Sequence, residues 1–166
     1  MAKVKSFLKR KDVEVSLKRY GIDALGAMAQ GLFCTLLVGT ILDTLGTQLG
    51  IAFLATPLIK IGEVGYTIGK FASSMVSPAM AVAIGYALHA PAMVLFSLIP
   101  VGYATNVMGG AGGPLAVYVV AIIAAEFGKM VSKETKIDIL VTPIVTILIG
   151  IGAAYFIAAP IGKGAM

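Results

Sequence analysis

The sequence predicts an all-α membrane protein, a bundle of transmembrane helices with about five crossings plus one re-entrant segment that contains a glycine-rich break. Three observations support this fold class. Apolar residues make up 58% of the 166 residues and charged residues 13%, which is typical of a bilayer-embedded domain. The apolar residues form runs near the length of a membrane-spanning helix. The basic residues gather before the first run, an asymmetry that membrane proteins show.

The first 21 residues form a basic segment that we expect on the cytoplasmic side. Seven lysines and arginines precede the first apolar run, and the positive-inside rule and attraction to anionic lipid assign them to the cytoplasm. Apolar residues are mixed with them from Ser6 to Tyr20, as in a helix along the membrane interface; a solvated tail is the alternative. This distribution argues against nucleic acid as a partner. The predicted domains are therefore 1–21 and the transmembrane part, 22–166.

The first crossing, near residues 24–42, has a face of small residues at four-residue spacing. Such a face lets another helix approach closely, which provides van der Waals contact where lipid supplies no hydrophobic drive. We expect it to pack within the protein or a dimer and not to touch a solute. The residues of this face are Ala27, Gly31, Thr35 and Gly39.

The other crossings are predicted at 51–68, 71–88, 114–128 and 137–159. Residues 92–104 are short for a crossing and contain Pro100, so they are predicted to form one arm of a re-entrant hairpin. This layout returns the basic connection after residue 128 to the cytoplasm and leaves the C-terminus outside. An odd number of crossings is expected of one half of an inverted-repeat transporter. We therefore expect either a fragment of a longer protein or a partner that supplies the remainder.

The glycine-rich break from Asn106 to Pro114 is the main candidate for a binding site. Irregular backbone at membrane depth is tolerated only where protein covers it or where it borders a watery cavity. Broken helices hold solutes in many transporters, because their exposed amides and half-helix ends form hydrogen bonds. An ordinary turn outside the membrane is the alternative. The candidate solute-binding residues in this stretch are Asn106, Gly109, Gly110, Gly112 and Gly113.

Two residues elsewhere are further candidates for solute binding. His89, the single histidine, ends the third crossing, where it could contact a solute or shuttle a proton; a histidine bonded to a carbonyl at the interface is the favoured alternative. Glu126 is either a buried coupling carboxylate or, as we favour, a surface partner of Lys129, three residues on and on the same helical face. A lone histidine without acidic or thiol neighbours gives no metal-site pattern. We expect neither a metal nor a cofactor.

The residues needed for enzymatic catalysis do not occur in a recognisable arrangement. No Ser-His-Asp set or carboxylate pair can be assembled, and the glycine-rich stretch lacks the Lys-Ser/Thr continuation of a phosphate-binding loop. Cys34 is the single cysteine and lies in an apolar run, so the chain has no disulfide framework and no CxxC redox pair. We predict that the protein is not an enzyme.

Several blocks of the sequence resemble the membrane-embedded IIC-type proteins of the bacterial phosphotransferase system. The first block is Ser16–Phe33, with its continuation Thr40–Gly46. The second, Gly112–Tyr118 and Lys136–Gly150, is similar to two successive spans of fructose-type IIC domains. The resemblance implies a location in the bacterial inner membrane and a sugar bound within it. It also implies separate IIA and IIB phosphocarrier partners, because the chain has no domain of either kind.

Two functions are consistent with these observations. The leading hypothesis is a transport subunit of the IIC type that moves a sugar or other small polar solute by alternating access, surrounded by lipid and associated with further copies of itself. The alternative is a non-transporting scaffold, sensor or lipid-binding protein that has a IIC-like fold. The missing phosphorylation domains and second half favour the alternative.

Overall fold

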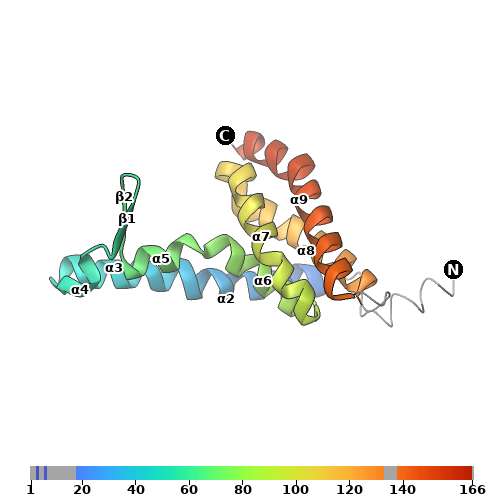
Figure 1. Cartoon of the computed structure of the whole chain (residues 1–166), viewed down its shortest axis with the longest axis horizontal. Helices are drawn as coiled ribbons and strands as arrows, with labels where there is room; N and C mark the ends of the chain where they lie inside the picture. The colour runs from blue at the N-terminus through green and yellow to red at the C-terminus, as the bar shows by residue number, and fades with distance from the viewer. Residues whose placement is uncertain (1–2, 4–5, 7–17, 133–137, 166) are drawn as a thin grey trace.

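The computed structural model describes residues 3, 6, 18–132 and 138–165, and these form two helical bodies (Figure 1). One body is a long arm and the other is a three-helix bundle that rises from one end of the arm at a wide angle. The predicted interfacial helix lies largely outside the described residues, as does much of the basic connection before the last helix. The predicted all-α class is confirmed.

The arm is built on one continuous helix, Lys18–Gln48. It consists of α2 (Ala24–Leu32) and α3 (Val38–Gln48), with π-helical turns before and between them at Lys18–Asp23 and Phe33–Leu37. Two shorter helices run antiparallel along it, α6 against α2 and α5 against α3. They are α5 (Ile68–Ser74) and α6 (Val76–Ala87).

The predicted face of small residues joins these two layers of the arm. A methyl group on Gly31 would lie 2.7 Å from the carbonyl oxygen of Ala79, and one on Gly39 would lie 2.5 Å from that of Gly69. A side chain larger than a hydrogen atom therefore has no room at these two contacts between helices. The prediction that this face packs inside the protein is confirmed.

A bend of 51° separates α5 from α6. Pro78 lies in the first turn of α6 and has no N–H to donate to the carbonyl of Ser74, four residues earlier. The hydroxyls of Ser73 and Ser74 donate instead to carbonyls of their own helix, at Lys70 and Phe71. Proline and these competing hydroxyls thus account for the break.

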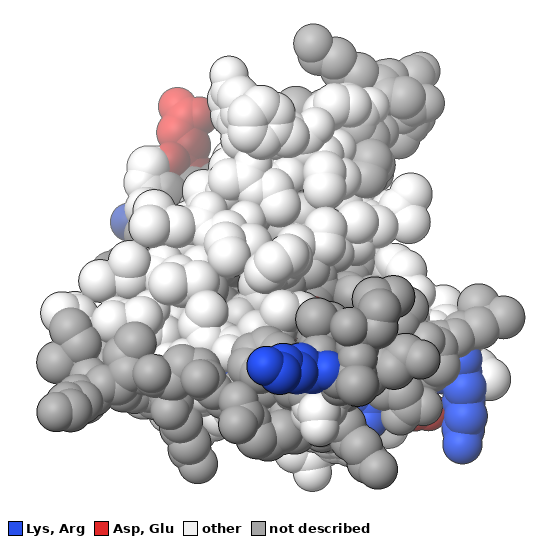
Figure 2. Space-filling model, turned by 90° about the vertical axis from the view of Figure 1, so that its right-hand side faces the viewer, with Lys and Arg blue, Asp and Glu red and all other residues white. Residues whose placement is uncertain are grey.

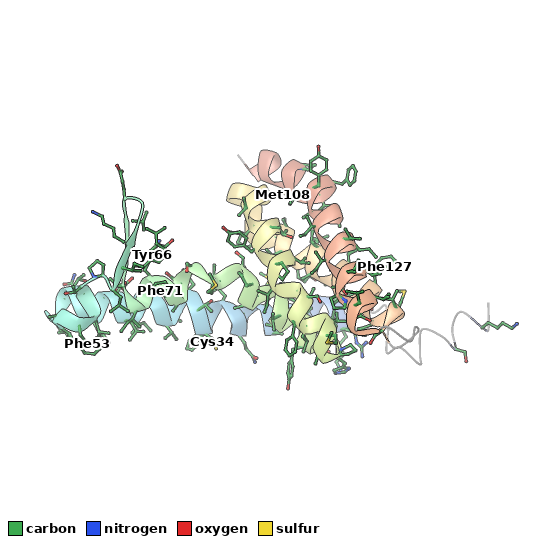
Figure 3. All side chains as sticks on the ribbon, in the orientation of Figure 1. Cys34, Phe53, Tyr66, Phe71, Met108 and Phe127 are labelled. Atoms are coloured by element: carbon green, nitrogen blue, oxygen red, sulfur yellow. The ribbon has the colours of Figure 1, made fainter. Side chains whose placement is uncertain are left out.

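The far end of the arm holds a short helix, α4 (Ala52–Ala55), and a hairpin of β1 (Ile59–Ile61) and β2 (Val64–Tyr66). The strands pair antiparallel, and Gly62 adopts a positive φ of 65° in the turn between them. Tyr66 packs on Phe71 of α5, with ring centroids 5.0 Å apart (Figure 3). The crossing predicted at 51–68 is therefore wrong. The β-branched residues of this segment are interrupted by glycines, which favours a hairpin over a helix.

The bundle consists of α7 (Ala92–Gly109), α8 (Gly113–Val131) and α9 (Asp138–Ala165), and each helix packs against the other two. Residues 92–104 belong to α7, an unbroken helix of 18 residues that contains Pro100. The prediction that they form one arm of a re-entrant hairpin is corrected accordingly, because α7 is long enough to span a membrane. Neighbouring helices compensate for the hydrogen bond that a proline removes.

Four described helices are long and apolar enough to cross a membrane, and five spans result if the bent pair α5–α6 counts as one. The predicted number of crossings is thus consistent with the structure, although different segments supply them. Figure 2 shows that the described surface of the bundle is almost free of charge, with lysine and arginine atoms at its foot. This pattern suits a wall that faces lipid.

We predict that Gly39→Ala lowers the free energy of unfolding by about 1–3 kcal/mol, because the methyl group overpacks the contact with Gly69. Gly26→Ala is the matched control on the same helix, since a methyl group there meets nothing within 4 Å. It should leave stability unchanged or raise it by about 0.5–1 kcal/mol. Thermal unfolding in detergent, followed by circular dichroism, measures both. Equal stability of the two variants would contradict the close packing.

Candidate functional site

The seven candidate residues fall into two groups at opposite ends of α8. Asn106 and the four glycines surround the turn before Gly113, where α8 begins. His89 and Glu126 lie at the other end. Glu126 follows Gly113 by 13 positions, which corresponds to about 20 Å along a helix axis. The structure therefore brings five of the seven residues together, and it places the other two at the opposite end of α8.

The glycine group forms a tight turn between α7 and α8. Gly110 adopts a positive φ of 52°, a conformation that residues with a side chain rarely adopt. It is the first residue of a single 3₁₀ turn, Gly110–Gly112. Gly109 is buried against Ala116, where a methyl group would lie 3.3 Å from the Ala116 side chain. A side chain on Gly113 would collide with the amide oxygen of Asn106. Gly109, Gly110 and Gly113 thus serve the sharp reversal of the chain or its close packing.

The hydrogen-bonding groups at this turn are the Asn106 amide and the first N–H groups of α8. Asn106 is half-buried in the last turn of α7. No side chain caps the start of α8. Within the part of the chain that the structure describes, the Asn106 amide forms no hydrogen bond. The turn therefore offers an amide donor, an amide acceptor and the positive end of a helix dipole to a polar ligand.

The opposite end of the bundle contains a buried ion pair on α8. Lys129 Nζ lies 3.0 Å from Glu126 Oε1, and the two side chains are only 1% and 8% exposed. The same ammonium group donates a hydrogen bond to the carbonyl of Leu88, just after α6. A buried charge needs such partners, because the low-dielectric interior does not replace its hydration.

Two tyrosines extend this ion pair toward the arm. The Tyr20 hydroxyl donates to Glu126 Oε2 at 2.8 Å, and the Tyr118 hydroxyl donates to the backbone carbonyl of Tyr20 at 2.6 Å. Both oxygens of the Glu126 carboxylate are thereby bonded. We call Tyr20, Tyr118, Glu126, Lys129 and the Leu88 carbonyl the foot network. It connects the first turn of the long helix, the end of α6 and the body of α8.

His89 lies next to the foot network, in the turn that ends α6. It is exposed and has a positive φ of 62°. The N–H of His89 bonds to the Tyr86 carbonyl and that of Ala90 to the Gly85 carbonyl, the pair of bonds that closes a Schellman turn. Its ring Nδ1 lies 3.5 Å from Nη2 of the buried Arg19. His89 therefore helps to join the arm to the start of α7.

The pairing of Glu126 with Lys129 is confirmed, but the prediction that the pair lies on the surface is wrong. Both residues are buried because α6, α7, α9 and the start of the long helix surround α8 at this level. Tyr20 and Tyr118 were not predicted as parts of the site. The available signal was weak: each is a polar ring next to or within an apolar run, with no local partner in the sequence.

These helices and their charge distribution define a multi-pass membrane protein that is almost entirely helical. A family model described as "Phosphotransferase system, EIIC" matches residues 22–166. The chain therefore belongs to the EIIC family of the phosphotransferase system, a family of membrane transport components. No curated protein and no solved structure matches the chain.

We predict that Lys129→Met destabilises the protein by about 3–5 kcal/mol, because it leaves the Glu126 carboxylate buried without its counter-charge. Tyr20→Phe should cost about 1.5–3 kcal/mol through the loss of one bond to a charged acceptor. The control is Tyr86→Phe, since the Tyr86 side chain is 74% exposed. Denaturant unfolding in detergent measures all three variants.

A double variant tests the cause of this effect. Combining Lys129→Met with Glu126→Gln removes the unpaired charge, so part of the lost stability should return. If Lys129→Met alone behaved like Tyr86→Phe, the ion pair would have no structural importance.

Proposed function

We propose that the chain is the membrane-embedded transport component of a phosphotransferase system and that it moves a sugar or other small polar solute by alternating access. Membership of the EIIC family, matched over residues 22–166, is the observation that carries this proposal. The division of the helices into an arm and a bundle supports it, because alternating access requires two bodies that move against each other.

The proposed motion is a change in the angle between the outer half of the arm and the bundle. The close packing at Gly31 on one side of the bend and at Gly39 on the other makes each half of the arm stiff. The bend at Met75, between α5 and α6, is the position in the arm where the helical hydrogen bonds are interrupted. α6 lies on the bundle side of this bend and packs against α7 and α8. α2 is packed on α6 at Gly31 and therefore stays with the bundle as well. A pivot at Met75 and at the adjacent π-helical turn Phe33–Leu37 would move the outer half of the arm, α3 and α5.

The proposed solute site is the glycine turn. A sugar presents hydroxyl groups that both donate and accept hydrogen bonds, and the Asn106 amide offers both functions in return. Gly109, Gly112 and Gly113 are buried and keep the turn tight beside this amide, and the exposed Gly110 lets a ligand approach the backbone closely. At the other end of α8, His89 is the exposed candidate. We assign to it contact with the solute at that end, with Glu126 behind it.

The proposed setting is a bacterial inner membrane with the N-terminus in the cytoplasm. Lys129 belongs to the foot network, and Lys18 and Arg19 directly precede Tyr20, whose hydroxyl bonds Glu126 there. The positive-inside rule assigns this end of the bundle to the cytoplasm. Soluble IIA and IIB phosphocarrier proteins would reach the transporter from this side. In this orientation the glycine turn lies toward the outer face.

Equilibrium dialysis of the purified protein against a panel of radiolabelled sugars tests the proposed site. We expect saturable binding of at least one sugar, weakened about tenfold or more by Asn106→Ala, since the loss of one well-placed hydrogen bond is worth about 1.4 kcal/mol. Tyr103→Phe is the matched control, because Tyr103 lies one turn earlier on α7 and is 59% exposed.

The outcomes of this assay distinguish the hypotheses. Unchanged binding by Asn106→Ala would remove the glycine turn from the site while leaving the transport function intact. Absence of binding for every sugar, together with no solute flux in liposomes, would favour a non-transporting scaffold, sensor or lipid-binding protein with this fold.

A further inference from the structure

The hairpin at the far end of the arm has one face of apolar side chains. In the register of β1 and β2, Ile61 lies opposite Val64, and Ile59 lies opposite Tyr66. Directly paired residues point to the same face of a sheet, and successive residues point to opposite faces. These four side chains therefore share one face, which we call the apolar face. Ile59, Ile61 and Val64 are 53%, 56% and 47% exposed, so the described chain leaves about half of each uncovered.

The other face of the hairpin and its tip are polar. Lys60 lies opposite Gly65 on that face, and Glu63 lies in the turn between the strands. Both charged side chains are exposed. They are also the only charged residues in the sequence between Asp43 and Lys70. The hairpin is therefore amphipathic, with its charges kept away from the apolar face.

The hairpin is held in a fixed orientation on the arm. The ring of Tyr66 packs on that of Phe71 in α5 (Figure 3). Thr67, directly after β2, donates to Oδ1 of Asp43 on α3 at 2.6 Å and accepts from the N–H of Lys70 at 3.0 Å. Because Tyr66 belongs to the apolar face, this face is turned toward the side of α5 that carries Phe71.

Phe71 connects the apolar face to a surface of the arm that faces lipid. α5 and α6 together form a candidate membrane span. Phe71 is 41% exposed on this span, and Met75, one turn later, is 48% exposed. Exposed apolar side chains on a membrane span contact acyl chains. The apolar face continues this surface beyond the start of α5, so the same lipid borders it.

The open edges of the hairpin limit how deep it can lie. A two-stranded sheet has an unpaired edge on each strand, and unpaired N–H and C=O groups do not occur in lipid-exposed positions within the hydrocarbon. At the membrane interface, head groups and water can bond to these groups. Lys60 can also extend its ammonium group toward the head groups. The hairpin is therefore suited to the interface, with its apolar face against the nearest part of the acyl chains.

We propose that the hairpin is a lipid anchor, whose apolar face binds acyl chains just below the head groups and sets the depth of α3 and α5 in the bilayer. The side chains of Ile59, Ile61 and Val64 have no hydrogen-bonding group, so their chemistry suits an acyl chain and not a polar solute. The close contact of Gly39 with Gly69 makes the hairpin, α3 and α5 one unit. The proposal requires only that the long helix crosses the membrane, so it is independent of the proposed solute.

Tryptophan fluorescence in liposomes provides a direct test, because the sequence contains no tryptophan. Ile61→Trp should emit at shorter wavelength than Lys60→Trp, and brominated lipid should quench it strongly. Lys60→Trp is the matched control, since Lys60 is the neighbour of Ile61 on the opposite face. Iodide in the water should quench this control more strongly than it quenches Ile61→Trp.

The position of the bromine reports the depth. Bromine near the head groups should quench Ile61→Trp more than bromine near the chain ends. Leu148→Trp should show the reverse, because Leu148 is 67% exposed near the middle of the span in α9. Strong quenching of both hairpin variants by iodide would place the hairpin in water. Weak quenching of Ile61→Trp by iodide and by both lipids would show that a protein covers the apolar face. Either result would overturn the proposal.

A charge on the apolar face tests what holds the hairpin at the membrane. Val64→Asp places a carboxylate directly opposite Ile61. In the Ile61→Trp background it should lower the ratio of inserted to withdrawn hairpin at least about tenfold, because an unpaired charge is unfavourable in lipid. Quenching by brominated lipid should fall and quenching by iodide should rise. Lys60→Asp, on the polar face, should change neither. Unchanged quenching after Val64→Asp would contradict the anchoring role.

Discussion

The buried ammonium group of Lys129 is the feature on which the arrangement of the arm and the bundle depends. A charge at this depth is tolerated only with close partners, and the described residues include two of them from different parts of the chain. Glu126 lies one turn earlier on α8, and the Leu88 carbonyl follows the last turn of α6. Glu126 is bonded in turn by Tyr20 at the start of the long helix. One charge therefore fixes three segments relative to one another.

The remaining features follow from that junction. The close contacts of Gly31 and Gly39 hold the long helix against α6 and α5, so each half of the arm is stiff on its own side of the bend. Pro78 interrupts the helical hydrogen bonds at the bend between α5 and α6. The glycine turn lies at the opposite end of α8 from the foot network. Three separate parts of the molecule thus serve the proposed motion. The foot network fixes the arm to the bundle, the bend between α5 and α6 allows movement, and the glycine turn is the proposed solute site.

The sequence predicted features that depend on composition and local spacing. The apolar content predicted the membrane class, the spacing of Gly31 and Gly39 predicted the packed face, and three-residue spacing predicted the pair of Glu126 with Lys129. Features that depend on contacts between residues far apart in the sequence were not predictable. The bond from Tyr20 to Glu126 joins residues 106 positions apart, and the burial of the pair depends on every helix around α8. The error at 51–68 arose because apolar content outweighed the glycines of the hairpin.

The most direct test of the account measures how firmly the foot network fixes the arm to the bundle. Spin labels at the exposed Gln48 and Val107, in a Cys34→Ser background, report the distance between the end of the arm and the top of the bundle by pulsed electron paramagnetic resonance. We predict a narrow distance distribution for the otherwise native chain and a broad one after Lys129→Met. Identical distributions with and without the Lys129 ammonium group would show that other contacts hold the two bodies together.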